Sequence, residues 1–210
     1  MRSHLFLERV STIPRLKSKE TKDIIKEAAI KVIAEVGFHH CNTDQIAREA
    51  GYSVGTIYNY FKNKEDILKY IFKVQHDQMK EMFGQLLELK EPVPVIIKTF
   101  FRQYYQRTLN NVRLGKLILD ESNRLTQGLN EDVVGFLLLI DDFLKDLLER
   151  GVKEGTIRDD IPPGVMASVI MGASNSMVLR GFLNQLSLKK ICDHAPDHLY
   201  HILLAGIFRE

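Results

Sequence analysis

The residues best suited to bind an anionic ligand lie in the stretch AGYSVGTIYNYFKNKED, residues 50–66. Phosphate oxygens accept hydrogen bonds from hydroxyl, amide and ammonium groups. The spacing of such donors in this stretch predicts a surface that binds phosphate groups. The donors are Ser53, Thr56, Tyr58, Tyr60 and Lys64.

Two short helices joined at a glycine must position these side chains. The first is expected to begin at Thr43, which can cap it, and to end at Gly51, because glycine accepts the left-handed conformation that terminates a helix. The second is expected over residues 54–60, with Ser53 as its cap. Two short helices with a glycine between them are typical of a helix-turn-helix.

The aromatic side chains of the second helix divide between core and surface. Ile57 and Phe61 are four residues apart and therefore lie on one face. A helix of two turns cannot bury Tyr58 and Tyr60 as well, so both are expected to be available to phosphate. Lys64 opens the next helix, where a positive charge opposes the helix dipole, and this placement predicts an anion nearby.

The stretch TDQIAREAGYSVGTIYNYFKNKEDIL, residues 43–68, resembles the DNA-binding motif of TetR-type transcriptional regulators. Tyr52 departs from the pattern, since the family often has valine there. The positions that fit the family pattern are Thr43, Ile46, Ala47, Ala50, Gly51, Ser53, Gly55, Ile57, Tyr58, Tyr60, Phe61, Lys64 and Leu68.

This resemblance implies a three-helix DNA-binding domain with residues 54–60 as its recognition helix. A helix fits the major groove, and short side chains near its N-terminus reach base edges. By similarity, the residues that contact phosphates would be Thr43, Ser53, Tyr58, Tyr60 and Lys64. Those that approach base edges would be Val54, Gly55, Thr56 and Asn59.

The whole chain is predicted to be all-α, with the DNA-binding domain followed by a larger helical domain. We expect a flexible basic arm over residues 1–17, the DNA-binding domain over 18–66 and the helical domain over 67–210. Residues 1–75 carry 13 Lys and Arg against 9 Asp and Glu, a net charge of +4, whereas residues 76–210 carry 16 against 18, a net charge of −2. The excess of positive charge favours a polyanion partner for the N-terminal third. Further helices are expected at about 19–36, 64–83, 93–111, 113–125, 130–154, 163–183 and 196–208.

In the family that this chain resembles, the larger domain binds a small molecule and dimerises through its last two helices. A homodimer and a small apolar or amphipathic effector are therefore implied, although plain core packing remains an alternative for the aromatic and methionine side chains that could form a pocket. Small residues in residues 166–183 would permit close helix contact in a dimer. The candidate ligand-binding residues are Phe100, Phe101, Tyr104, Tyr105, Phe136, Ile140, Phe143 and Met171.

Other classes of protein are poorly supported. There is no phosphate-binding loop, nucleophile elbow or HExxH motif, so no catalytic residue, cofactor or metal is assigned. The histidines at 194, 198 and 201, near Cys192, could hold zinc but more often line an interface or face water. No apolar run approaches a membrane span, the N-terminus lacks a secretory signal, and two distant cysteines fit a reducing compartment, so a cytoplasmic location without a membrane partner is expected.

Two functions remain open from the sequence. The first is a transcriptional regulator, a repressor released from a near-palindromic operator in double-stranded DNA by its effector. The second is a DNA-binding protein without a small ligand that is architectural or controlled by a protein partner. An enclosed cavity in residues 76–210 would favour the first, and a solidly filled core the second.

Overall fold

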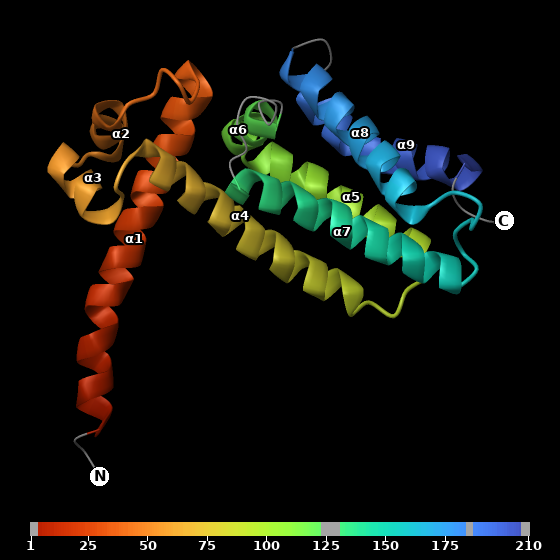
Figure 1. Cartoon of the computed structure of the whole chain (residues 1–210), viewed down its shortest axis with the longest axis horizontal. Coiled ribbons are helices and arrows are strands. Elements are labelled where there is room, and N and C mark those ends of the chain that lie inside the picture. The colour runs from red at the N-terminus through yellow and green to blue at the C-terminus, as the bar shows by residue number, and fades with distance from the viewer. Residues whose placement is uncertain (1–3, 123–130, 184–186, 207–210) are drawn as a thin grey trace. The chain divides into compact units, whose positions relative to one another are not determined.

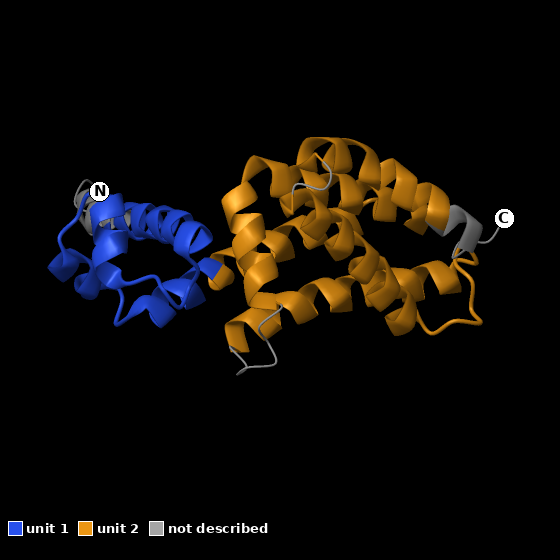
Figure 2. Ribbon diagram, turned by 90° about the horizontal axis from the view of Figure 1, so that it is seen from above, with its two compact units in different colours: residues 1–71 blue, residues 72–210 orange. Residues whose placement is uncertain are grey.

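The computed structural model describes residues 4–122, 131–183 and 187–206, with side chains described between residues 18 and 202 of these ranges. The described residues form nine α-helices and no β-strand, which confirms the predicted all-α fold (Figure 1). The chain divides into two compact units, Met1–Ile71 (unit 1) and Phe72–Glu210 (unit 2) (Figure 2). Unit 1 extends beyond residue 66, where the domain was expected to end.

Unit 1 consists of helices α1 (His4–Val36), α2 (Thr43–Ala50) and α3 (Val54–Tyr60) and the first turns of α4 (Lys64–Leu87). Helix α1 ends where the sequence predicted, because Gly37 adopts a left-handed φ of 81°. Apolar side chains from all four helices are buried and form the core of the unit. They include Ile25, Ala29, Ile33, Ile46, Ala47, Ile57, Ile67, Leu68 and Ile71.

Helix α1 begins at His4, whereas the sequence analysis placed a flexible arm over residues 1–17. Pro14 lies inside this helix, and three leucines and two arginines in residues 4–17 are good helix formers. Residues 1–3 and the side chains of residues 4–17 lie outside the described part of the chain.

Unit 2 consists of the remainder of α4 and five further helices. Helix α5 packs against α9 and α7, α7 packs against α8, and α8 packs against α9. Helix α6 packs against α5, α7 and α8. The bounds are α5 (Val93–Asn110), α6 (Val112–Ser122), α7 (Glu131–Lys153), α8 (Pro163–Phe182) and α9 (Leu188–Gly206).

Two helices of unit 2 are longer than their sequence pattern indicated. Helix α4 continues to Leu87 instead of ending near residue 83. Helix α9 begins at Leu188 and passes through Pro196, where the helix was expected to start. A proline inside a helix removes one backbone hydrogen bond. Burial of Ile191 and Leu199 on the face that also carries Pro196 offsets this loss.

Among the described residues, α8 is the one helix long and apolar enough, by length and composition, to cross a membrane. Core helices of water-soluble proteins also pass this test. One side of α8 is packed in unit 2, with Met166, Ile170, Ser174 and Val178 buried. Packing of this side accounts for part of the apolar composition of α8, since 39% of its apolar window is buried.

Candidate functional site

The turn between α2 and α3 is built by capping interactions at both helix ends. Asn42, and not Thr43 as the sequence analysis expected, caps α2. Its side chain accepts a hydrogen bond from the Gln45 amide at 2.9 Å, and the Gln45 side chain accepts one from the Asn42 amide at 2.9 Å. Gly51 ends α2 with φ 72° and ψ 25°, a conformation that glycine adopts without strain.

The capping of α2 shows a signal that the sequence analysis missed. Asparagine followed three residues later by glutamine is the spacing of a capping box, in which two free backbone donors are satisfied reciprocally. With Asn42 as the cap, Thr43 becomes the first residue of the helix. Its hydroxyl lies 3.2 Å from the Tyr58 hydroxyl, which links α2 to α3.

Ser53 caps α3 as predicted and orients a neighbouring side chain. Its oxygen accepts a hydrogen bond from the Thr56 amide at 3.1 Å. The two hydroxyl oxygens of Ser53 and Thr56 lie 2.9 Å apart. Both residues are candidates for DNA contact, and these interactions fix their hydroxyl groups at the N-terminus of α3.

The predicted division of side chains between core and surface is confirmed for Ile57, Phe61 and Tyr58, whereas Tyr60 is intermediate. Ile57 is fully buried and Phe61 is 3% exposed, so both anchor the helix in the core of unit 1. Tyr58 is 54% exposed, Asn59 is exposed and Tyr60 is half-buried. Helix α3 therefore presents a polar face to the outside of the unit while its apolar face is held in place.

Gly55 lies on the same exposed part of α3. A Cβ atom added to it would meet only the Ser53 hydroxyl oxygen at 3.8 Å, an ordinary contact. Packing within the unit therefore does not require glycine here. The absence of a side chain leaves the backbone open to a close approach from outside.

Lys64 is engaged inside unit 1. Its ammonium group donates to the carbonyl oxygens of Phe38, His39 and Cys41 at 3.0, 3.2 and 3.0 Å. The Nζ atom also lies 4.8 Å from the centre of the Phe38 ring. An ammonium group has three N–H donors. The positive charge at the start of α4 is thus balanced by carbonyl groups that lie 23–26 residues earlier in the chain.

None of the nine candidate DNA-contact residues is buried. They lie on α2, α3, the residue that caps α3 and the first residue of α4, all within unit 1. Hydroxyl donors and the exposed N-terminal end of α3 are therefore gathered on one short helix and its neighbours. Such an arrangement can hydrogen-bond phosphate groups and offer short side chains to base edges.

Unit 2 contains a cavity of about 100 Å³ between α4, α5, α6, α7 and α8. Four of the eight candidate ligand-binding residues line it: Tyr104, Phe136, Ile140 and Met171. Arg107, which the sequence offered either as a group that orients the polar end of a ligand or as a surface residue, also lines it. Lining residues that the sequence analysis did not select include Gln75, Met79, Thr108, Asn111, Leu114, Ser122 and Asn175. Polar helix residues carry no sequence signal that distinguishes a cavity wall from the surface.

The other four candidates are part of the core. Phe100, Phe101 and Tyr105 are fully buried and do not line the cavity. Phe143 stacks on Phe83, with ring centres 3.9 Å apart and the rings inclined by 4°. The alternative of plain core packing therefore describes these four side chains.

Two tyrosine hydroxyls in this region stay protonated at neutral pH. Burial raises the pKa of Tyr104 well above its ordinary value, and its hydroxyl donates to the Asn175 side-chain oxygen at 3.0 Å. Burial also raises the pKa of Tyr105 to about 12, and its hydroxyl lies 3.8 Å from the Met177 sulfur. Tyr104 and Asn175 thus place a polar pair in a mainly apolar cavity.

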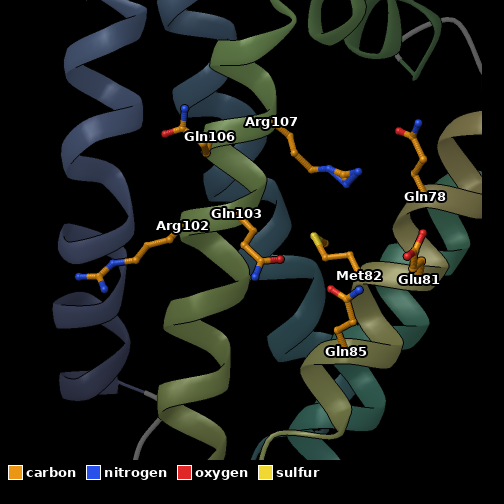
Figure 3. A pocket seen from close by; sticks show the side chains of 8 residues that line it. All are labelled: Gln78, Glu81, Met82, Gln85, Arg102, Gln103, Gln106 and Arg107. Atoms are coloured by element: carbon orange, nitrogen blue, oxygen red, sulfur yellow. The ribbon is translucent and has the colours of Figure 1, made fainter.

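A second, open and more polar hollow of about 610 Å³ lies between α4 and α5 (Figure 3). Its walls carry amide and charged side chains, together with Met82. The lining residues are Gln78, Glu81, Met82, Gln85, Arg102, Gln103, Gln106 and Arg107. We call this hollow the α4–α5 groove.

The histidines of α9 do not form a metal centre in the described part of the chain. The rings of His194 and His198 stack with centres 6.0 Å apart, and both side chains are exposed. No group of three His, Cys, Asp or Glu side chains in the described ranges could hold a metal ion.

Comparison with known proteins identifies the family of this chain. Residues 25–71 match the family described as bacterial regulatory proteins, tetR family. The fatty acid metabolism regulator protein of Bacillus subtilis (strain 168) is 33% identical over 201 residues, covering 93% of this chain and 100% of that protein.

Solved structures resemble the whole fold. The fatty acid degradation regulator FadR from Bacillus halodurans matches with a TM-score of 0.75 at 24% identity, covering 88% of this chain and 95% of that one. The transcriptional regulator FadR from Bacillus subtilis, in complex with stearoyl-CoA, matches with a TM-score of 0.70 at 25% identity, covering 84% and 96%. The chain belongs to the TetR family of bacterial regulatory proteins and is a DNA-binding transcriptional regulator.

Proposed function

We propose that this regulator is a cytoplasmic repressor that binds a near-palindromic operator as a homodimer and is released by a long-chain acyl thioester. The observation that carries the proposal is the exposed polar face of α3, whose hydroxyl donors are already held in place by Ser53 and Thr43. Side chains that are ordered before binding lose less conformational entropy when the complex forms.

The DNA contacts follow from this face. We assign phosphate contacts to Thr43, Ser53, Tyr58 and Tyr60, and base-edge contacts to Val54, Gly55, Thr56 and Asn59. Lys64 has all three of its donors engaged with carbonyl oxygens. We therefore assign it a role in holding the turn before α2, with its charge close to the bound phosphates.

The exposed face of α8 supports a homodimer. Val165 and Val169 are 52% and 62% exposed and lie on one side of the helix, and Leu183, directly after it, is 58% exposed. Gly172, Ala173 and Ser176 lie exposed on the same side, where small residues permit close helix contact. On α9, Ile202 is 67% exposed. An apolar stripe of this kind marks an interaction surface. A second copy of the chain would bury it.

An acyl thioester is the effector class that we favour, because the similar FadR from Bacillus subtilis was solved with stearoyl-CoA. The cavity of about 100 Å³ is smaller than the roughly 300–1,000 Å³ that is common for small-molecule sites. The cavity must therefore open to admit an acyl chain. Met79 and Met171 on its wall can change rotamer readily, which suits a variable apolar guest.

Helix α4 offers the connection between ligand and DNA. Gln75 and Met79 line the cavity, and Lys64 at the start of the same helix holds the turn before α2. A ligand that opens the cavity displaces α4 and so changes the separation of the two α3 helices in the dimer. The ligand must bind more tightly to the released conformation than to the DNA-bound one for this to occur.

The alternative of a DNA-binding protein without a small ligand predicts a solidly filled unit 2. The cavity lined by Tyr104, Asn175 and Met171 favours the effector-controlled regulator instead.

Selection of bound sequences from a random duplex pool at physiological salt tests the proposal. An enriched near-palindrome is expected, with half-sites related to one turn of DNA, roughly 34–36 Å. Salt-sensitive binding to every sequence without enrichment would contradict it and would favour the architectural alternative.

A further inference from the structure

We propose that Arg107 binds the phosphorylated head group of the acyl thioester, with the acyl chain in the cavity and the head group in the α4–α5 groove. This inference rests on the proposed effector class. It assigns a binding residue and divides the ligand between two adjoining spaces of unit 2.

Helices α4 and α5 supply walls to both spaces. On α4, Gln75 and Met79 line the cavity, whereas Gln78 and Met82, each three residues later, line the groove. On α5, Tyr104 lines the cavity, whereas its neighbour in sequence, Gln103, lines the groove. The two spaces therefore lie along adjacent faces of the same pair of helices, and one elongated ligand can occupy both.

Arg107 is the one residue that lines both the cavity and the groove. Its side chain extends from α5 toward α4 and across the groove in Figure 3. It is exposed, and its guanidinium group makes no hydrogen bond or ion pair with any residue in the described part of the chain. Among the described residues it is thus an unpaired cation, and it lies at the junction of an apolar and a polar space.

Arg102 lines the same groove but is engaged elsewhere. Its guanidinium group lies 3.3 Å from the Asp197 carboxylate of α9 and points away from Arg107 (Figure 3). Lys98 also contacts Asp197, at 2.9 Å. The hydrogen bond from Lys98, together with Arg102, holds the pKa of Asp197 below its ordinary value. Of the two arginines in the groove, Arg107 alone is available to a ligand.

The chemistry of the groove fits a phosphorylated head group. A guanidinium group presents a planar fork of N–H donors that matches phosphate oxygens. Three glutamine side chains add neutral donors and acceptors for the remainder of a nucleotide-like head: Gln78, Gln85 and Gln103. Glu81 is the one acidic residue among the described residues that line the groove, and its negative charge repels a bound anion. A free fatty acid would leave most of this space empty.

The test compares stearoyl-CoA with stearoyl-pantetheine, which keeps the acyl chain and thioester but has no phosphate, using calorimetry on the full chain. We expect wild-type protein to bind stearoyl-CoA more tightly. Arg107→Gln should lower the affinity for stearoyl-CoA about tenfold or more, as is typical of a lost charge-assisted hydrogen bond. The affinity for stearoyl-pantetheine should be unchanged. Arg113→Gln, at an exposed arginine of α6 that lines neither space, is the matched control and should change neither affinity. Glu81→Gln should strengthen stearoyl-CoA binding.

Three results separate the possible failures. If wild-type protein binds neither compound, the proposed effector class is wrong, and this inference falls with it. If wild-type and Arg107→Gln proteins bind stearoyl-CoA equally, the effector class stands and the assignment of Arg107 is wrong. If Arg107→Gln lowers the affinity for both compounds equally, Arg107 supports the cavity and does not bind the head group.

Discussion

The DNA-facing surface of unit 1 and the cavity of unit 2 differ in how far each is formed before its partner arrives. On α3 the polar side chains are exposed and held by local hydrogen bonds, such as those between Ser53 and Thr56. In unit 2 the cavity is small, and its wall includes the flexible side chains of Met79 and Met171. One site can receive its partner as it stands, whereas the other must rearrange.

This difference has a consequence for regulation. In the proposed mechanism the ligand-free protein is the DNA-binding form, because its preformed surface needs little ordering for binding. In the proposed mechanism, an acyl chain enters the cavity of about 100 Å³ only by displacing its walls, including α4. The binding free energy of the ligand is then partly used to change conformation, which is the requirement for a ligand-controlled repressor.

The largest expected effect comes from breaking the geometry of the preformed surface. Gly51→Val places a β-branched residue at φ 72°, so we expect the free energy of unfolding to fall by about 1–3 kcal/mol. Gly55→Ala is the matched variant, because an added methyl group meets only one atom, at 3.8 Å. It should leave thermal stability unchanged and weaken DNA binding. Unchanged DNA affinity in Gly55→Ala would show that α3 does not approach DNA closely there.

Filling the cavity should abolish ligand binding without affecting DNA binding. Met171→Trp places a bulky side chain against Ile140 and Tyr104, so the affinity for stearoyl-CoA should fall at least about tenfold, while overpacking lowers stability by about 1–3 kcal/mol. DNA binding by the folded protein should be unchanged and should no longer respond to stearoyl-CoA. Calorimetry and fluorescence anisotropy measure the two affinities. Full retention of the ligand response would place the acyl chain elsewhere.

Substitution of Lys64 tests whether this residue supports the DNA-facing surface or contacts DNA directly. Lys64→Met leaves three carbonyl oxygens without their charged donor, so chemical denaturation should show a loss of about 1–2 kcal/mol. Lys62→Met, at an exposed neighbouring lysine, should leave stability unchanged. A direct phosphate contact predicts instead an unchanged stability for Lys64→Met and a salt slope reduced by about one.

The smallest expected effect is on a single hydroxyl group. Tyr58→Phe removes one uncharged phosphate donor and the link to Thr43, so binding to every sequence should weaken by about 0.5–1.5 kcal/mol without a change in the salt slope.

Thr56→Ala should alter the preferred sequence instead. Competition between duplexes in anisotropy measurements checks both. Equal weakening of all sequences by Thr56→Ala would contradict its assignment to base reading.

The helix-turn-helix was predictable because its signals are local. The bounds of α3, its cap Ser53 and the glycine after α2 depend on residues a few positions apart. The cap of α2 was assigned one residue late, to Thr43, although the asparagine and glutamine of a capping box are visible in the sequence. The carbonyl partners of Lys64 lie 23–26 residues away, and no local pattern indicates them.

The cavity was predicted only in part, because its lining depends on packing between distant helices. Tyr104 and Phe100 lie on the same helix and both read as apolar aromatic positions, yet only Tyr104 reaches the cavity. Arg107 and Asn175 carry no signal that distinguishes them from surface residues. The sequence therefore indicates which helices form unit 2 but not which side of each helix faces a ligand.

The most direct test measures, by fluorescence anisotropy, whether stearoyl-CoA releases the protein from a selected operator duplex. We expect tight binding by the ligand-free protein and full release as stearoyl-CoA is added. By linkage, saturating operator must weaken stearoyl-CoA binding by the same factor. If the protein binds both partners tightly at once, with neither affinity changed by the other, the cavity does not control the DNA surface and the proposed mechanism is wrong.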